Sequence, residues 1–80
     1  MVILEIKNNC EITEEFDCLD SVKNSSIGWL EVYEDIDKDS GYLDEKENYS
    51  TEIEIVKKAK NINSINEIMG AFGYEYQEVE

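Results

Sequence analysis

The stretch YEDIDKDSGYLDEKENYSTEIE, Tyr33 to Glu54, decides the fold that the sequence predicts. It carries nine carboxylates and two lysines, a pattern shared by calcium loops, acidic tethers and charged hairpins. The segments at its two ends alternate side-chain character with a period of two, which is typical of half-buried strands. Gly41 lies near the middle of the acidic connection. We therefore expect a long hairpin, with strands at residues 27–36 and 49–57.

The residues before this hairpin predict a strand and a short helix. The side chains of residues 2–7 alternate between two faces. One face carries Val2, Leu4 and Ile6 and the other carries Ile3, Glu5 and Lys7, which indicates a first strand. Thr13 is a suitable N-cap, and the apolar residues after it recur at spacings of three. We expect a helix over residues 13–23, with a loop or a strand extension through residues 10–12 as the alternatives.

The residues after the hairpin predict a helix and a last strand. Ser64 and Glu67 form a capping-box pattern, and an apolar stripe at helical spacing overlaps it. Gly73 is suited to end this helix in a left-handed conformation. A helix is therefore expected over residues 64–72 and a strand over residues 74–79.

The resulting order is β-α-β-β-α-β. It predicts an α+β fold of the ferredoxin-like βαββαβ type, an antiparallel sheet with two helices on one face and the other face open. A length of 80 residues predicts a single domain, residues 1–80, with a small core and little room for an enclosed active site. The hydrophobic fraction of 41% is too high for a disordered chain, so the chain is expected to fold.

Charge narrows the possible functions. The formal net charge is −13, from 20 acidic residues and seven lysines, with no arginine and no histidine. Without histidine the chain lacks the commonest general base and zinc ligand, and without arginine it lacks the bidentate phosphate clamp. Such a surface repels phosphates, so direct binding of nucleic acid is disfavoured. We expect a basic protein partner, no catalytic residues and no cofactor.

The two cysteines and the lengths of the apolar segments indicate in which cellular compartment the protein is expected. With only Cys10 and Cys18, no disulfide framework is expected, and both are predicted to be reduced core residues of a cytoplasmic protein. No apolar run approaches the ~20 residues that a membrane-spanning helix needs. We expect a monomer or a weak homodimer, with no membrane association.

A calcium loop is the alternative for the acidic connection. Asp35, Asp37 and Asp39 match the first, third and fifth positions of the EF-hand pattern. Gly41 falls one residue late, however, and Glu47 follows the twelfth position instead of occupying it. A small cation-binding or regulatory adaptor module using residues 35–47 is therefore the second hypothesis, and no metal ligand is assigned.

The acidic surface is the leading candidate for binding. Residues 31–54 hold ten acids and two lysines, which is more than half of the excess charge. On a strand, Glu52 and Glu54 would lie about 6.8 Å apart, close to the spacing of phosphates along a nucleic-acid strand. Aromatic side chains inside a charged rim are typical of interface hot spots. The predicted partner-binding residues are Trp29, Glu31, Tyr33, Glu34, Asp35, Asp37, Asp39, Tyr42, Asp44, Glu45, Glu47, Glu52 and Glu54.

In these features the chain resembles small acidic phage-encoded inhibitors of host defence, the anti-CRISPR and anti-restriction proteins that mimic nucleic acid. The resemblance lies in size, charge and expected fold, and includes no motif. It implies a non-enzymatic binder, without cofactor, that occupies a basic nucleic-acid groove of a CRISPR effector or restriction nuclease in the cytoplasm of the host.

Overall fold

The fold begins with a tight β-hairpin. In the computed structural model, which describes residues 1–79, strands β1 (Val2–Lys7) and β2 (Glu11–Phe16) pair antiparallel. Asn8 and Asn9 both adopt positive φ angles, 54° and 63°, and the Cys10 amide donates to the Lys7 carbonyl. Asparagine tolerates this left-handed conformation, so Asn8 and Asn9 can occupy the centre of the tight three-residue connection between Lys7 and Glu11.

Three α-helices follow the hairpin in the described part of the chain: α1 (Leu19–Asp39), α2 (Ser50–Lys58) and α3 (Ile62–Met69). A short 3₁₀ turn, η1 (Gly70–Phe72), then leads into strand β3 (Tyr74–Val79).

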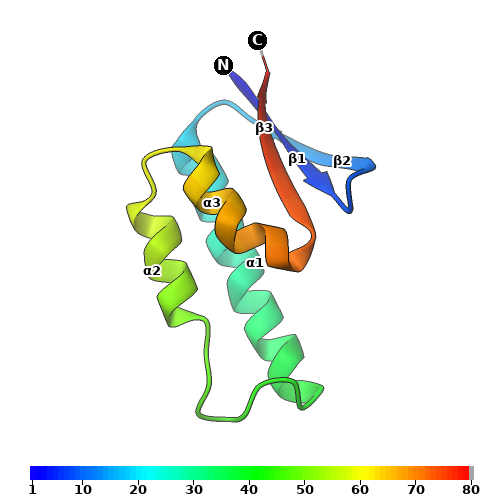
Figure 1. Cartoon of the computed structure of the whole chain (residues 1–80), viewed down its shortest axis with the longest axis vertical. Coiled ribbons are helices and arrows are strands. Elements are labelled where there is room, and N and C mark those ends of the chain that lie inside the picture. Colours follow the sequence, from blue (N-terminus) through cyan, green and yellow to red (C-terminus); the bar gives the residue numbers. More distant parts are fainter. Residues whose placement is uncertain (80) are drawn as a thin grey trace.

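Strand β1 is the central strand of the sheet. The order is β2-β1-β3 and both pairings are antiparallel. Val2 pairs with Val79, so the two ends of the chain lie side by side (Figure 1). The long helix α1 runs past the sheet, and its connection to α2 forms the end of the molecule away from the termini (Figure 1).

The helices cover one face of the sheet (Figure 1). Buried strand residues such as Ile3, Phe16 and Tyr76 pack in one cluster with helix residues such as Leu30 and Ile65. The sheet's other face is open, as the sequence predicts. Three of its apolar side chains, those of Val2, Ile12 and Val79, are exposed.

The predicted α+β class is confirmed, but the ferredoxin-like order is wrong. The observed order is β-β-α-α-α-β. The predicted strand at residues 27–36 is the C-terminal part of α1, and the predicted strand at residues 49–57 belongs to α2. In α1 the buried positions are Val22, Ser26 and Leu30, and this spacing of four follows a helical face instead of a strand.

The predicted first helix at residues 13–23 is also wrong in its first half. Residues 11–16 form a separate strand, β2, and not an extension of the first strand, and helix begins only at Leu19. Cys10 and Cys18 were predicted to be core residues, but both are exposed.

The elements at the two ends of the chain agree with the prediction. The first strand and the last strand are confirmed. The helix predicted at residues 64–72 is present but begins at Ile62, because the Asn61 side chain accepts from the Ser64 amide (3.1 Å) and acts as N-cap. Gly73 has φ 85° and ends the 3₁₀ turn in the left-handed conformation that the sequence predicts.

Candidate functional site

Three exposed carboxylates line the outer face of α1. Glu31, Asp35 and Asp39 are each four residues apart, so they fall on one side of the helix and follow one another at about 6 Å along its axis. We call them the acidic row. They lie on the part of α1 that extends toward the end of the molecule away from the termini (Figure 1).

The position of the acidic row works against the stability of its own helix. Like charges at i,i+4 destabilise a helix, and carboxylates near its C-terminus meet the negative end of the helix dipole. Lys38 is the only basic residue in the last turn of α1, and it pairs with Glu34 (3.9 Å). The carboxylates of the acidic row therefore contribute nothing favourable to the helix that carries them.

The connection from α1 to α2, residues 40–49, folds back on the helix end. The amides of Tyr42 and Leu43 both donate to the Asp37 carbonyl, at 2.8 and 3.0 Å. Farther along, the Asp44 amide donates to the Glu47 side chain (3.2 Å). Asp44, Glu45 and Glu47 are exposed, and they extend the negative charge of α1 around the end of the molecule.

Two side chains of α1 fix where this connection ends. The Tyr49 amide donates to Glu34 (2.7 Å), and the Tyr49 hydroxyl donates to the Asp37 carboxylate. Burial and this bond to Asp37 raise the pKa of Tyr49 to about 12, so the hydroxyl keeps its proton at neutral pH. Glu34 and Asp37 thus have structural partners within the fold, unlike the three residues of the acidic row.

Beside this junction lies a hollow of about 630 Å³, which we call the aromatic cleft. Its aromatic lining consists of Tyr33 from α1, Tyr42 and Tyr49 from the connection, and Phe72 from η1. Phe72 stacks on Tyr33 with ring centroids 5.1 Å apart, and the edge of Tyr49 meets Phe72 at 5.3 Å. Tyr42 is 84% exposed and stands at the rim.

The predicted anchor Trp29 is part of an aromatic stack that continues beyond the cleft. Its ring stacks on Tyr74 of β3 (centroids 5.5 Å apart) and lies 6.1 Å from Tyr33. It remains 36% exposed, so part of the side chain is open to a partner.

Glu52 and Glu54 do not act together, contrary to the expectation from a strand. On helix α2, residues two apart point in different directions. Glu54 is on the surface and pairs with Lys57 and Lys58, both at 3.9 Å, whereas Glu52 lines the aromatic cleft. The phosphate-like spacing of about 6.8 Å predicted for this pair is therefore wrong.

Six residues of the cleft lining are not among the predicted site residues: Lys7, Tyr49, Glu67, Ile68, Ala71 and Phe72. The Lys7 ammonium donates to the Tyr33 hydroxyl (2.9 Å) and the Phe72 carbonyl (3.0 Å), and it lies 4.0 Å from the centre of the Tyr74 ring. Lys7 is 26 and 65 residues away from these two hydrogen-bond partners. No local sequence signal could have placed it there.

The cation-loop alternative finds no support in the described residues. Asp35, Asp37 and Asp39 lie within α1 instead of in a loop. Asp37 turns inward to Tyr49, while the other two lie on the outer face. Among residues 1–79, no three carboxylate or cysteine side chains are grouped closely enough to hold a metal ion.

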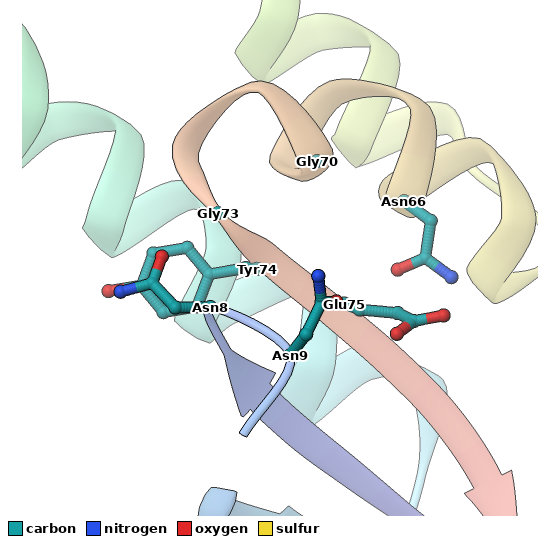
Figure 2. Close-up of a pocket in the computed structure, with 7 residues that line it drawn as sticks. All are labelled: Asn8, Asn9, Asn66, Gly70, Gly73, Tyr74 and Glu75. Atoms are coloured by element: carbon teal, nitrogen blue, oxygen red, sulfur yellow. The ribbon is translucent and has the colours of Figure 1, made fainter. Parts of the chain in front are cut away.

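A second hollow, of about 550 Å³, lies between the β1–β2 turn, α3 and β3 (Figure 2). Asn66 reaches from α3 toward β3, where its side chain donates to the Tyr76 carbonyl (3.0 Å) and accepts from the Tyr76 amide (2.7 Å). The Asn8 amide donates to the Gly73 carbonyl (2.8 Å), and a Cβ on Gly73 would come within 2.6 Å of the Asn8 side chain. The Asn66 side chain and the Asn8 amide therefore hold elements together at this hollow.

Comparison with known proteins gives no relative: no family model, no curated protein and no solved structure matches the chain. Within residues 1–79, none of the helices combines the length and the apolar character required to cross a membrane.

Proposed function

We propose that this chain is a non-enzymatic inhibitor that binds the basic nucleic-acid groove of a host defence nuclease. The observation that carries the proposal is the acidic row. Glu31, Asp35 and Asp39 are exposed, evenly spaced and without a basic partner among the described residues. Each has a like charge at i,i+4 on α1, and Asp39 also lies in the last turn, where a carboxylate costs stability. Binding to a positively charged surface explains their placement, whereas helix stability does not.

The spacing of the row supports mimicry of a phosphate backbone. Carboxylates at about 6 Å intervals along a helix offer lysines and arginines a series of anions in place of phosphates. Asp44, Glu45 and Glu47 add further negative charge at the same end of the molecule. The partner is then a basic nucleic-acid-binding protein, possible examples being a CRISPR effector or a restriction nuclease. Such an inhibitor would act in the cytoplasm of the host cell, as one copy in each groove.

Displacement of DNA from purified nucleases tests the proposal. Fluorescence anisotropy of a labelled duplex would follow its release from a panel that includes a guide-loaded CRISPR effector and a restriction endonuclease. We expect the chain to release DNA from at least one member. The variant Glu31→Gln/Asp35→Asn/Asp39→Asn should raise the concentration needed for half-release at least tenfold, because it removes the anions that replace the phosphates.

A matched control separates a specific surface from net charge. Glu11→Gln/Glu14→Gln/Glu15→Gln changes the net charge by the same amount on exposed residues of β2. It should shift half-release less than threefold. Equal losses in the two variants, or no release of DNA from any nuclease of the panel, would overturn the proposal.

A further inference from the structure

The aromatic cleft combines ring walls with carboxylates that have no cationic partner. Asp37, Glu52 and Glu67 come from three different helices and all line it. None of the three takes part in a salt bridge within the described residues, in which the ion pairs use Glu34 and Glu54 instead. The cleft is therefore lined by three carboxylates and one cation, Lys7, which makes no ion pair with any of them.

Glu52 is the least satisfied of these side chains. Its Oε2 atom is buried and accepts no hydrogen bond from any described residue. A buried acceptor without a donor costs free energy, and the cost is greater for a charged group. A ligand that brings positive charge to this carboxylate would lower that cost. Of the two glutamates on α2, Glu54 therefore has cationic partners, whereas the buried oxygen of Glu52 has no hydrogen-bond donor among the described residues.

The cleft already shows that its walls accept a cation. The Lys7 ammonium is held by the Tyr33 hydroxyl, the Phe72 carbonyl and the face of the Tyr74 ring, without a carboxylate partner among the described residues. Aromatic faces attract cations because the ring quadrupole is negative above and below the plane. Lys7 occupies this position beside Tyr33 and Phe72, while Asp37, Glu52 and Glu67 form no ion pair within the described residues.

We propose that the aromatic cleft takes an arginine side chain of the basic partner protein. The cleft volume of about 630 Å³ accommodates such a side chain, and the apolar lining of Ile68 and Ala71 suits its methylene groups. A guanidinium group stacks on aromatic rings and presents five donors to several carboxylates at once. An apolar side chain would instead bury the three carboxylates without a counter-charge.

This inference rests on the proposed function, because the partner is the nuclease whose groove meets the acidic row. The row steers the basic surface toward this end of the molecule, and the cleft holds one of its side chains. A buried arginine at the centre of an acidic surface is typical of the residues that dominate binding energy in protein interfaces.

Titration with Nα-acetyl-arginine amide tests the cleft directly. Nα-acetyl-citrulline amide is the matched neutral probe, since it keeps the shape of arginine and lacks its charge. We expect the arginine probe to shift the backbone amide signals of Tyr49, Glu52 and Phe72 in two-dimensional NMR spectra at millimolar concentration. The citrulline probe should bind at least tenfold more weakly.

Three variants locate the binding. Glu52→Gln keeps the size of the side chain and should weaken the arginine probe at least fivefold, whereas Glu54→Gln makes the same change of charge on the same helix and should weaken it less than twofold. Tyr42→Ala removes an exposed ring at the rim and should weaken it about threefold without loss of the fold. Equal effects of Glu52→Gln and Glu54→Gln would overturn the inference. So would equal binding of the two probes, or unchanged binding in Tyr42→Ala.

The outcome also separates this inference from the proposed function. If the chain displaces DNA from a nuclease but the arginine probe does not bind, the cleft inference fails and the proposed function stands. If the probe binds in a Glu52-dependent way while no nuclease releases DNA, the proposed function fails and the cleft is supported as an arginine site.

Discussion

At the scale of single residues, Glu5 shows how a carboxyl group can lie in the centre of a small core. Glu5 is 1% exposed and accepts hydrogen bonds from Thr13 of β2 (2.7 Å), Ser25 of α1 (3.4 Å) and Tyr76 of β3 (2.8 Å). The Tyr76 hydroxyl in turn accepts from Ser26 (3.1 Å). These hydroxyl groups link three elements to the central strand, so the network fixes their relative positions as well as satisfying the buried group.

Removal of one hydroxyl from this network is expected to be costly. Tyr76→Phe removes the phenol hydroxyl that donates to Glu5 and accepts from Ser26. Because both groups are buried, this change should lower the free energy of unfolding by about 1–3 kcal/mol. Tyr42→Phe, which removes a hydroxyl from a side chain 84% exposed, should change it by less than about 0.5 kcal/mol. Urea denaturation followed by circular dichroism measures both. A loss in Tyr76→Phe no larger than that in Tyr42→Phe would contradict the role of the network.

The same residue explains part of what the sequence could not predict. Alternation along β1 correctly predicted a strand, but it could not show which face is buried. The buried face carries Ile3 and Glu5, whereas Val2 on the other face is exposed. A glutamate is normally a sign of the solvent face. It is buried here because its hydrogen-bond donors come from residues up to 71 positions away, which no local pattern reveals.

At the scale of elements, the main error of the sequence prediction lies in α1. Residues 27–36 are rich in β-branched and aromatic side chains, and Asn24, Ser25 and Ser26 before them resemble a helix stop. Ser26 instead occupies a core position of the helix, where it bonds to Tyr76. A polar residue on the buried face interrupted the helical period, and tertiary contacts overrode the local strand preference.

The acidic row gives a prediction for α1 itself. Glu31→Gln/Asp35→Asn/Asp39→Asn should raise the free energy of unfolding by about 0.5–1.5 kcal/mol at low salt, because it removes two like-charge i,i+4 pairs and relieves the helix dipole. The replacements have helix propensities close to those of the originals. Urea denaturation measures the change, with Glu11→Gln/Glu14→Gln/Glu15→Gln as the control of equal charge and smaller gain. If the row variant were less stable than the wild type, the carboxylates would have a structural role.

At the scale of the whole molecule, the composition gave the net charge but could not predict how the charged side chains are arranged on the surface. The net charge of −13 directed attention to residues 31–54, which hold ten of the 20 acidic residues. The sequence could not separate Asp37 and Glu52, which face the cleft, from Asp35 and Glu54, which face solvent, because that division depends on helical geometry. Lys7, Glu67 and Phe72 complete the cleft only through contacts between the two ends of the chain.

The net charge also predicts opposite effects of salt on folding and on binding. Repulsion among 20 acidic residues destabilises the compact state, and salt screens it, since the Debye length falls from about 30 Å at 0.01 M to about 10 Å at 0.1 M. The urea midpoint should therefore rise between 0.02 and 0.5 M NaCl. Association with a basic groove should weaken over the same range, because screening reduces the attraction that brings the two surfaces together.

Choice of salt distinguishes screening from specific ion binding. Choline chloride should reproduce the effect of NaCl on the urea midpoint at equal ionic strength, because screening depends on ionic strength and not on the identity of the cation. Calcium chloride at matched ionic strength should add no more than a small further increase. A midpoint that rises steeply with calcium alone would favour the cation-binding alternative for residues 35–47. A midpoint that falls with added NaCl would show that surface ion pairs, and not net repulsion, dominate the electrostatics of this fold.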